Sequence, residues 1–324
     1  EKDRIRTVTR LLHQACKPIR VLRTIDWAPE VKATFLANGC RELPQVTYPP
    51  FDPGPTITAV REARRLTLPV TTIDSWLERH AQAIELSARM LAAVGTHSFF
   101  EFGRQIYGEP TAPLRYADVT PLDLAQSVID TIAQLTAVNI PIAPPAYHDA
   151  ETVAADLTQA VKAHFGDQAP AVELVDRLSA NALATAKAIR VRRSARFTDR
   201  DYVQLLNHEA YIHVATSLNG KAQTDLPLLA AGHPGTTRTQ EGLAVLAEVI
   251  SGSIELDRLR RLADRVLAIQ MAIEGADFLQ VHAFFMERTG DPDQAYENTR
   301  RVFRGGVITG GAPFCKDLVY LLGL

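Results

Sequence analysis

The chain has 324 residues, 46% of them hydrophobic and 22% charged, which is enough length and apolar content to bury a sizeable core. Its formal net charge of -2 gives no electrostatic basis for binding nucleic acid or an anionic membrane, and no run of 18 apolar residues is present to span a bilayer. Its three cysteines are far apart and include no CxxC pair, which excludes a dense disulfide framework and favours a reducing, cytoplasmic location.

Apolar residues at helical spacing predict a mainly α fold (α+β class) with a small β-sheet, in one domain over residues 1–324. In chain order, we expect a strand at 18–27, a proline-rich loop at 41–56, helices at 73–95, 120–139 and 149–166, and a proline-rich connection at 140–148. Further helices are expected at 253–275 and 290–306, the last one capped by Asp291 with Pro292 in its first position.

A second strand is predicted at residues 188–198, where basic residues alternate with apolar ones. This alternation places one face of the strand in solvent or in a cleft. The strand either pairs along its edge with an extended peptide or is simply a solvated basic strand.

Residues 198–220 predict one helix that contains the run HEAYIH. Its boundary signals are a capping box of Thr198 and Asp201 at the start and Asn219–Gly220 at the end. On a regular α-helix, His208 and His213 would point about 140° apart, because they are five residues apart. A shared metal ion therefore requires a π-bulge, or a local overwinding or break, between them. The alternative is two unrelated histidines in the core.

A third metal ligand is available on the next predicted helix, which Thr239 would cap and which carries Glu241 in its first turn. Two histidines and a glutamate leave the fourth position of a zinc ion open for water, as catalytic zinc sites require. Glu241 could instead only complement the helix dipole. Glu248, on the same face, is either a rival ligand or a hydrogen-bond partner of a ligating histidine.

The run HEAYIH, followed by GHPGTTRTQEGLAVLAE, resembles the QEGLA-motif family, whose animal members resemble the microtubule-associated tyrosine carboxypeptidases. The similarity extends from about SARFTDRDYVQLLNHE to FCKDLVYLLG near the C-terminus. It implies a helical zinc-metallopeptidase fold with the catalytic half at about residues 181–324. It further implies that His208, His213 and Glu241 bind zinc and that Glu209 is the catalytic base.

Groups that could contact the substrate are less sharply defined. The oxyanion of the transition state needs a donor, for which His233, Tyr211 and Tyr320 are candidates. A terminal carboxylate needs a cation. The chain offers Arg238 close to the predicted metal ligands, and Arg301, Arg304 and Lys316 in the glycine-rich C-terminal segment. Each of these cations could equally be an ordinary surface charge, and Tyr320 could line the pocket or belong to the core.

The motifs and the family resemblance together predict a zinc-dependent metallocarboxypeptidase that acts on the C-terminus of a peptide or protein, with no nucleic-acid or membrane partner. Glu209 would activate a zinc-bound water. Two alternatives remain at this stage: a metal-binding regulatory protein without hydrolysis, and a zinc amidase with a non-peptide substrate. Glu209 argues against the first alternative, because a purely structural metal site needs no base.

Overall fold

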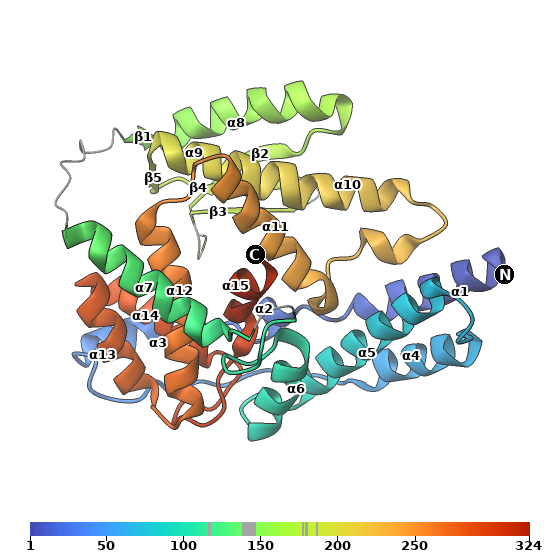
Figure 1. The fold of residues 1–324 in the computed structure, drawn as a ribbon, viewed down its shortest axis with the longest axis horizontal. Helices are drawn as coiled ribbons and strands as arrows, with labels where there is room; N and C mark the ends of the chain where they lie inside the picture. The colour runs from blue at the N-terminus through green and yellow to red at the C-terminus, as the bar shows by residue number, and fades with distance from the viewer. Residues whose placement is uncertain (116–117, 138–146, 177, 179–180, 186) are drawn as a thin grey trace.

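Helices make up most of the molecule, and two small sheets complete it (Figure 1), which confirms the mainly α class. The structure is a computed structural model that describes residues 1–115, 118–137, 147–176, 178, 181–185 and 187–324. The helices of the first half are α1 (Lys2–Cys16), α2 (Val21–Thr24), α3 (Pro29–Ala37), α4 (Gly54–Leu66), α5 (Thr72–Ala92), α6 (His97–Tyr107) and α7 (Pro121–Ala137). Those of the second half are α8 (Ala150–Phe165), α9 (Asp199–Leu205), α10 (Ala215–Ala222), α11 (Pro234–Ile250), α12 (Leu256–Ile273), α13 (Phe278–Thr289), α14 (Pro292–Phe303) and α15 (Val319–Gly323).

The predicted helices outside the HEAYIH region are confirmed as α5, α7, α8, α12 and α14. The side chain of Asp291 accepts hydrogen bonds from the first turn of α14, which starts with Pro292, as the sequence indicates. The proline-rich loop ends at Pro53, because α4 already begins at Gly54. The connection predicted at 140–148 falls, as far as residue 146, outside the described residues.

The strand predicted at 18–27 is wrong, because the structure has the short helix α2 there. The backbone N–H groups of Thr24 and Ile25 donate to the carbonyls of Arg20 and Val21, which closes one helical turn. Ile19 and Ile25 are buried on either side of this turn. A short apolar run fits one helical turn as well as a strand, so the pattern alone could not separate the two.

The sheets are small and belong to the second half of the chain. The larger sheet has the order β2 (Ala171–Val175), β4 (Ala188–Arg192), β3 (Ala182–Ala184), with β2 parallel and β3 antiparallel to β4. The other sheet pairs β1 (His148–Asp149) with β5 (Arg196–Phe197). The strand predicted at 188–198 is therefore split in two. Its first part lies in the middle of a sheet, so that part cannot bind a peptide along a free edge.

The described residues form two hydrophobic cores. The larger core is formed by the N-terminal helices with α11 to α15, and the smaller one by α8, the strands, α9 and residues 206–214. In Figure 1 the elements of the smaller core form the upper layer, and α11 passes from that layer towards the lower helices. Residues 206–214 and α11 thus contribute to different cores and meet where these cores adjoin.

Two glycines allow α11 and α15 to pack at backbone distance. A Cβ atom added to Gly242 would lie 2.2 Å from the carbonyl carbon of Gly323, and one added to Gly323 would lie 2.2 Å from the carbonyl oxygen of Arg238. Side chains at these positions would force the helices apart. Because Gly242 directly follows Glu241, this contact also fixes the position of the predicted third ligand.

We predict that Gly242→Ala lowers the free energy of unfolding by about 1–3 kcal/mol, the usual cost of overpacking a tight contact. Equilibrium denaturation measures this change. Gly232→Ala is the control, because a Cβ atom there would meet no other atom within 4 Å. Equal stability of the two variants would show that the contact between α11 and α15 is not as close as described.

Candidate metal centre

The helix that carries HEAYIH changes from α to π geometry at the two histidines. Leu206–Val214 is a π-helix between α9 and α10. In a π-helix, residue i bonds to residue i+5, so side chains five apart lie on the same side. The rings of His208 and His213 accordingly lie 4.8 Å apart, measured between their centroids. The predicted irregularity is confirmed, although it spans nine residues rather than a single-residue bulge.

The start of this helical segment is as predicted, but its end is not. Thr198 and Asp201 form the predicted capping box at the start of α9. Asn219 and Gly220 do not end the helix, because α10 continues to Ala222. Gly220 instead permits close packing, since a Cβ atom there would lie 2.2 Å from the carbonyl oxygen of Leu229.

Glu241 comes from α11, which starts earlier than predicted. The cap is His233, whose ring accepts a hydrogen bond from the N–H of Gly235, and Pro234 is the first helical residue. The predicted cap at Thr239 is therefore wrong, and Glu241 lies well inside the helix rather than in its first turn. Threonine is a common cap, and the Pro234–Gly235 pair resembles a loop in sequence, so local signals favoured the later start.

His208, His213 and Glu241 converge on one point and could hold a metal ion. The Oε2 atom of Glu241 is 3.7 Å from Nε2 of His208 and 3.9 Å from Nε2 of His213. Ligands at about 2.1 Å in a tetrahedral zinc site lie about 3.4 Å apart. Both distances are close to what a zinc ion would require, and the imidazole and carboxylate donors are ones that zinc commonly binds.

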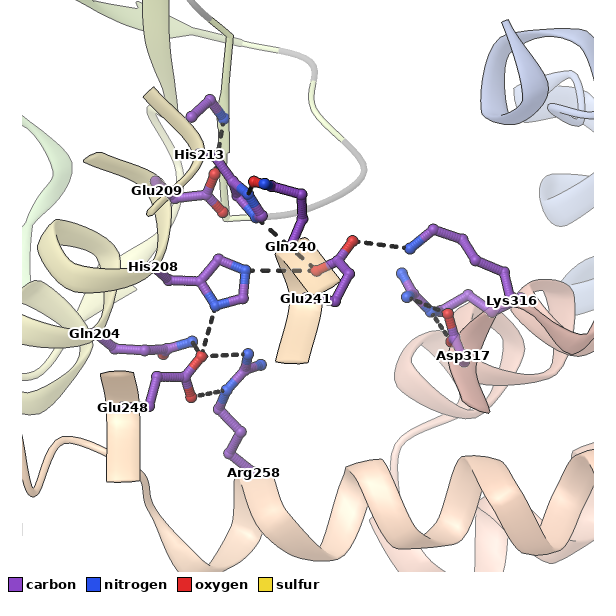
Figure 2. A network of polar contacts seen from close by, with 12 residues as sticks. Gln204, His208, Glu209, His213, Gln240, Glu241, Glu248, Arg258, Lys316 and Asp317 are labelled. Carbon is purple, nitrogen blue, oxygen red and sulfur yellow. Dashed lines mark hydrogen bonds and ion pairs between the residues drawn. The ribbon is translucent and has the colours of Figure 1, made fainter. Parts of the chain in front are cut away.

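The second ring nitrogen of His208 is held by a buried ion pair. Nδ1 of His208 lies 2.7 Å from Oε1 of Glu248, and Glu248, which is fully buried, also accepts from Arg258 (Figure 2). Burial opposes protonation of His208, but its hydrogen bonds to Glu241 and Glu248 outweigh burial and raise its pKa to about 9. Glu248 is therefore placed as the partner of a histidine, which leaves Nε2 to face the metal position.

The other histidine is oriented by Gln240, which precedes Glu241. Its Oε1 atom lies 3.4 Å from Nδ1 of His213, so Nε2 of that ring faces the metal position (Figure 2). The QEGLA run thus combines an orienting amide, a metal-facing carboxylate and the glycine that contacts α15. Gln240 and Arg258 were not predicted from the sequence, and no local pattern connects Arg258 to Glu248.

Glu209, the predicted base, is held by a backbone group of the small sheet. Its Oε2 atom accepts a hydrogen bond of 2.9 Å from the N–H of Ala184, the last residue of β3. Ala184 lines the same cavity as His213 and Glu241, and the charge of Glu209 acts on the pKa of His208. The carboxylate is therefore fixed close to the metal position without being one of the three convergent groups.

A cavity of about 380 Å³ opens beside the His–His–Glu group. Its walls come from both halves of the chain, including α2, the end of α6, β3, α10 and the segment before α11. Apolar lining residues are Ile19, Val21, Leu22, Leu229, Ala230 and Ala231, and polar ones include Thr185, Thr216, Ser217, Thr236 and Thr237. This volume is at the lower end of that of small-molecule sites and suits one amino-acid residue.

Lys316 lines the cavity and also contacts Glu241, one of the three convergent groups. Its Nζ atom is 3.0 Å from Oε1 of Glu241, so one carboxylate oxygen faces the histidines and the other faces the lysine (Figure 2). Burial opposes the charge of Lys316, but the neighbouring Tyr320 and Glu241 outweigh burial and raise its pKa. Burial likewise opposes the charge of Glu241, but Lys316 and the histidines hold its pKa well below the ordinary range.

None of the other predicted substrate contacts is among the described residues that line the cavity. Arg301 forms a two-bond ion pair with Asp317, and the exposed Arg238 donates to the carbonyl of Leu322 at 3.1 Å. Arg304 is buried, with its guanidinium carbon 5.8 Å from the centre of the Phe314 ring. The ring centre of Tyr320 lies 5.1 Å from Nζ of Lys316, so this tyrosine packs beside the lysine.

The predicted oxyanion donors have other partners. His233 lines the cavity, but its Nδ1 accepts from Gly235, and its Nε2 lies 3.0 Å from Nδ1 of His80. A neutral imidazole whose Nδ1 is an acceptor has its only proton on Nε2, so Nε2 of His233 donates its hydrogen bond to Nδ1 of His80. Tyr211 packs on His164, with 4.6 Å between the ring centroids, at the smaller core.

Comparison with protein-family models gives the context for this geometry. Residues 33–324 match the model of the microtubule-associated tyrosine carboxypeptidases. The chain belongs to this family. This match confirms the predicted enzyme class, a carboxypeptidase and hence a hydrolase. It also confirms the resemblance seen in the two motifs. The match extends much further towards the N-terminus than those motifs do.

A search of curated proteins found no match. Within the described part of the chain, no helix is long and apolar enough to cross a membrane.

We predict that His208→Ala, His213→Ala and Glu241→Ala each abolish binding of about one zinc per chain, because three protein ligands leave no redundancy. Glu248→Gln should keep the site but weaken zinc binding by roughly 10- to 100-fold, the usual effect of losing a partner of a ligating histidine. Metal analysis of the purified variants and competition with a chelator give these values, with Glu62→Ala on the exposed face of α4 as the control. Full zinc content in Glu241→Ala together with its loss in Glu248→Gln would reverse the two roles.

Proposed function

We propose that the protein is a zinc-dependent metallocarboxypeptidase that removes a residue from the C-terminus of a peptide or protein. The observation that carries this proposal is the convergence of His208, His213 and Glu241 beside a cavity, with Glu209 fixed next to them. Membership of a carboxypeptidase family supports the reaction type. The family description makes a protein that ends in tyrosine the first substrate to test.

The residues divide the chemistry between them. His208, His213 and Glu241 would hold zinc, which when bound lowers the pKa of a coordinated water and polarises the scissile carbonyl. Glu209 takes a proton from the attacking water and delivers it to the leaving amine. The N–H of Ala184 occupies one oxygen of Glu209, which restricts the carboxylate to one orientation and leaves the other oxygen for the proton. The cavity receives the residue that is released.

The two alternatives make different demands on the same residues. A regulatory metal protein needs the ligand group but neither a positioned Glu209 nor an adjacent cavity. A zinc amidase would use both but would not require a free carboxylate on its substrate. The presence of both features favours an enzyme, and the substrate's C-terminus distinguishes the two enzymatic functions. The cytoplasmic location stays a prediction.

We predict that Glu209→Gln binds zinc normally and loses roughly 10² to 10⁴-fold in turnover, the usual contribution of a positioned base. The amide oxygen can still accept from Ala184, so the fold and the ligand group should be preserved. Zinc content and peptide hydrolysis are measured on the same preparation. Wild-type turnover in this variant would exclude the proposed mechanism.

We also predict that peptides with a free C-terminus lose one residue and that the same peptides with an amidated C-terminus are not cleaved. Mass spectrometry of the products, with a peptide series that varies the last residue, gives both results. Equal cleavage of the two forms would instead indicate an amidase or an endopeptidase. If no peptide is cleaved by a zinc-loaded protein, the regulatory alternative is favoured.

A further inference from the structure

Two polar groups that line the cavity take no direct part in the proposed metal chemistry. Lys316 is the only lysine or arginine among the described residues that line the cavity. An ammonium group has three donors, and Glu241 accepts one of them. Lys316 is 8% exposed, so an anion that reached it would leave most of its water behind. Charge-assisted hydrogen bonds are strong in such surroundings.

The second group is the hydroxyl of Tyr107, at the end of α6. This residue is 3% exposed and lines the cavity, and its hydroxyl has no hydrogen-bond partner among the described residues. Its ring packs edge-on against Phe314, with centroids 5.5 Å apart, which fixes the direction of the hydroxyl. The hydroxyl is not among the enclosed polar atoms that lack a partner, so it is open to the cavity and can donate a hydrogen bond to a ligand there.

We propose that Lys316 and Tyr107 together bind the terminal carboxylate of the substrate and thereby make the enzyme an exopeptidase that releases single residues. This inference rests on the proposed carboxypeptidase function and names the residues that bind the C-terminal carboxylate of the substrate. The described residues that line the cavity do not include Arg238, Arg301 or Arg304. Arg301 is already paired with Asp317.

The distances fit the removal of one residue. In a peptide, the terminal carboxylate carbon is three bonds from the scissile carbonyl carbon, roughly 3–4 Å through space. Nζ of Lys316 is 3.0 Å from one oxygen of Glu241, whose other oxygen is 3.7 Å from Nε2 of His208. The width of the Glu241 carboxylate therefore separates the lysine from the two histidines. A substrate with its carboxylate on Lys316 would place its last peptide bond, not an earlier one, at that group.

The competing interpretation gives Lys316 a purely structural role, as the ion-pair partner that orients Glu241. The two roles predict different measurements. Loss of an orienting partner weakens zinc binding and affects every substrate alike. Loss of a carboxylate-binding group removes the preference for a free C-terminus over an amidated one. That preference is a ratio of two affinities measured on one protein, so general damage to the site largely cancels from it.

The test uses zinc-loaded Glu209→Gln protein as the parent, so that bound peptides stay intact. Fluorescence anisotropy with an N-terminally labelled peptide gives Kd for the free and the amidated form. We expect the parent to bind the free form more tightly than the amidated form. The ratio of the two Kd values should fall by about 10- to 100-fold in Lys316→Met and by about 10-fold in Tyr107→Phe, the scale of hydrogen bonds to a charged group. Lys221→Met, on the exposed end of α10, is the control and should keep the parent ratio.

Each outcome decides the proposal. The proposal is overturned if both Lys316→Met and Tyr107→Phe keep the parent ratio of the Kd values for the amidated and the free peptide. It is also overturned if Arg238→Met alone loses the preference for the free form. If Lys316→Met does not fold or does not hold zinc, Tyr107→Phe decides, because it removes a single oxygen atom. Hydrolysis by the wild-type protein is assayed in parallel. If peptides with a free C-terminus are cleaved but substitution of Lys316 and Tyr107 has no effect, only this inference is refuted. If no peptide is cleaved at all, both the proposed function and this inference are refuted.

Discussion

The bonding of residue i to residue i+5 between Leu206 and Val214 is the constraint on which the convergence of His208, His213 and Glu241 depends. A regular α-helix would direct His208 and His213 away from each other, and no side-chain rotation would easily bring both imidazoles to one ion. The widened turn must also be held at its ends. A capping box fixes the start of α9, and the close approach of Gly220 to the chain at Leu229 fixes α10. The unusual helix therefore lies between two ordinary, well-anchored segments.

Buried charges around the centre are balanced locally, and this balance sets the orientation of the metal-facing groups. Glu248 is paired with His208 and Arg258, Glu241 with Lys316, and Asp317 with Arg301. Breaking a buried pair by removing one partner leaves an uncompensated charge, which is costly. These pairs connect the π-helix to α11, α12 and the C-terminal segment. The site thus shares its polar network with the packing of the surrounding helices.

The position of the site between two cores explains why distant segments contribute to it. The π-helix packs into the smaller core through Ala210 and Val214, whereas α11 packs into the larger core through Val245. The histidines and Glu241 are therefore presented by two separately packed units, and the cavity forms where the units adjoin. Residues of the first half complete its walls, including Val21 on α2 and Tyr107 on α6. The catalytic motifs alone do not build this binding site.

The sequence by itself identified the three groups that converge, predicted Glu209 as the base and required an irregular helix. His208, Glu209 and His213 lie in one short run, and a spacing of five excludes a shared metal on a regular helix, so local geometry sufficed. The amphipathic helices and the capping boxes followed from local patterns for the same reason. Only the tertiary structure decided the short helix at 21–24, the earlier start of α11 and the place of β4 inside its sheet, because each depends on contacts with distant segments. It also decided which predicted cation lies at the cavity. Arg301, Arg304 and Lys316 are similar in sequence context, but Asp317 pairs with Arg301, Phe314 packs on Arg304, and Lys316 alone of the three reaches Glu241 and the cavity.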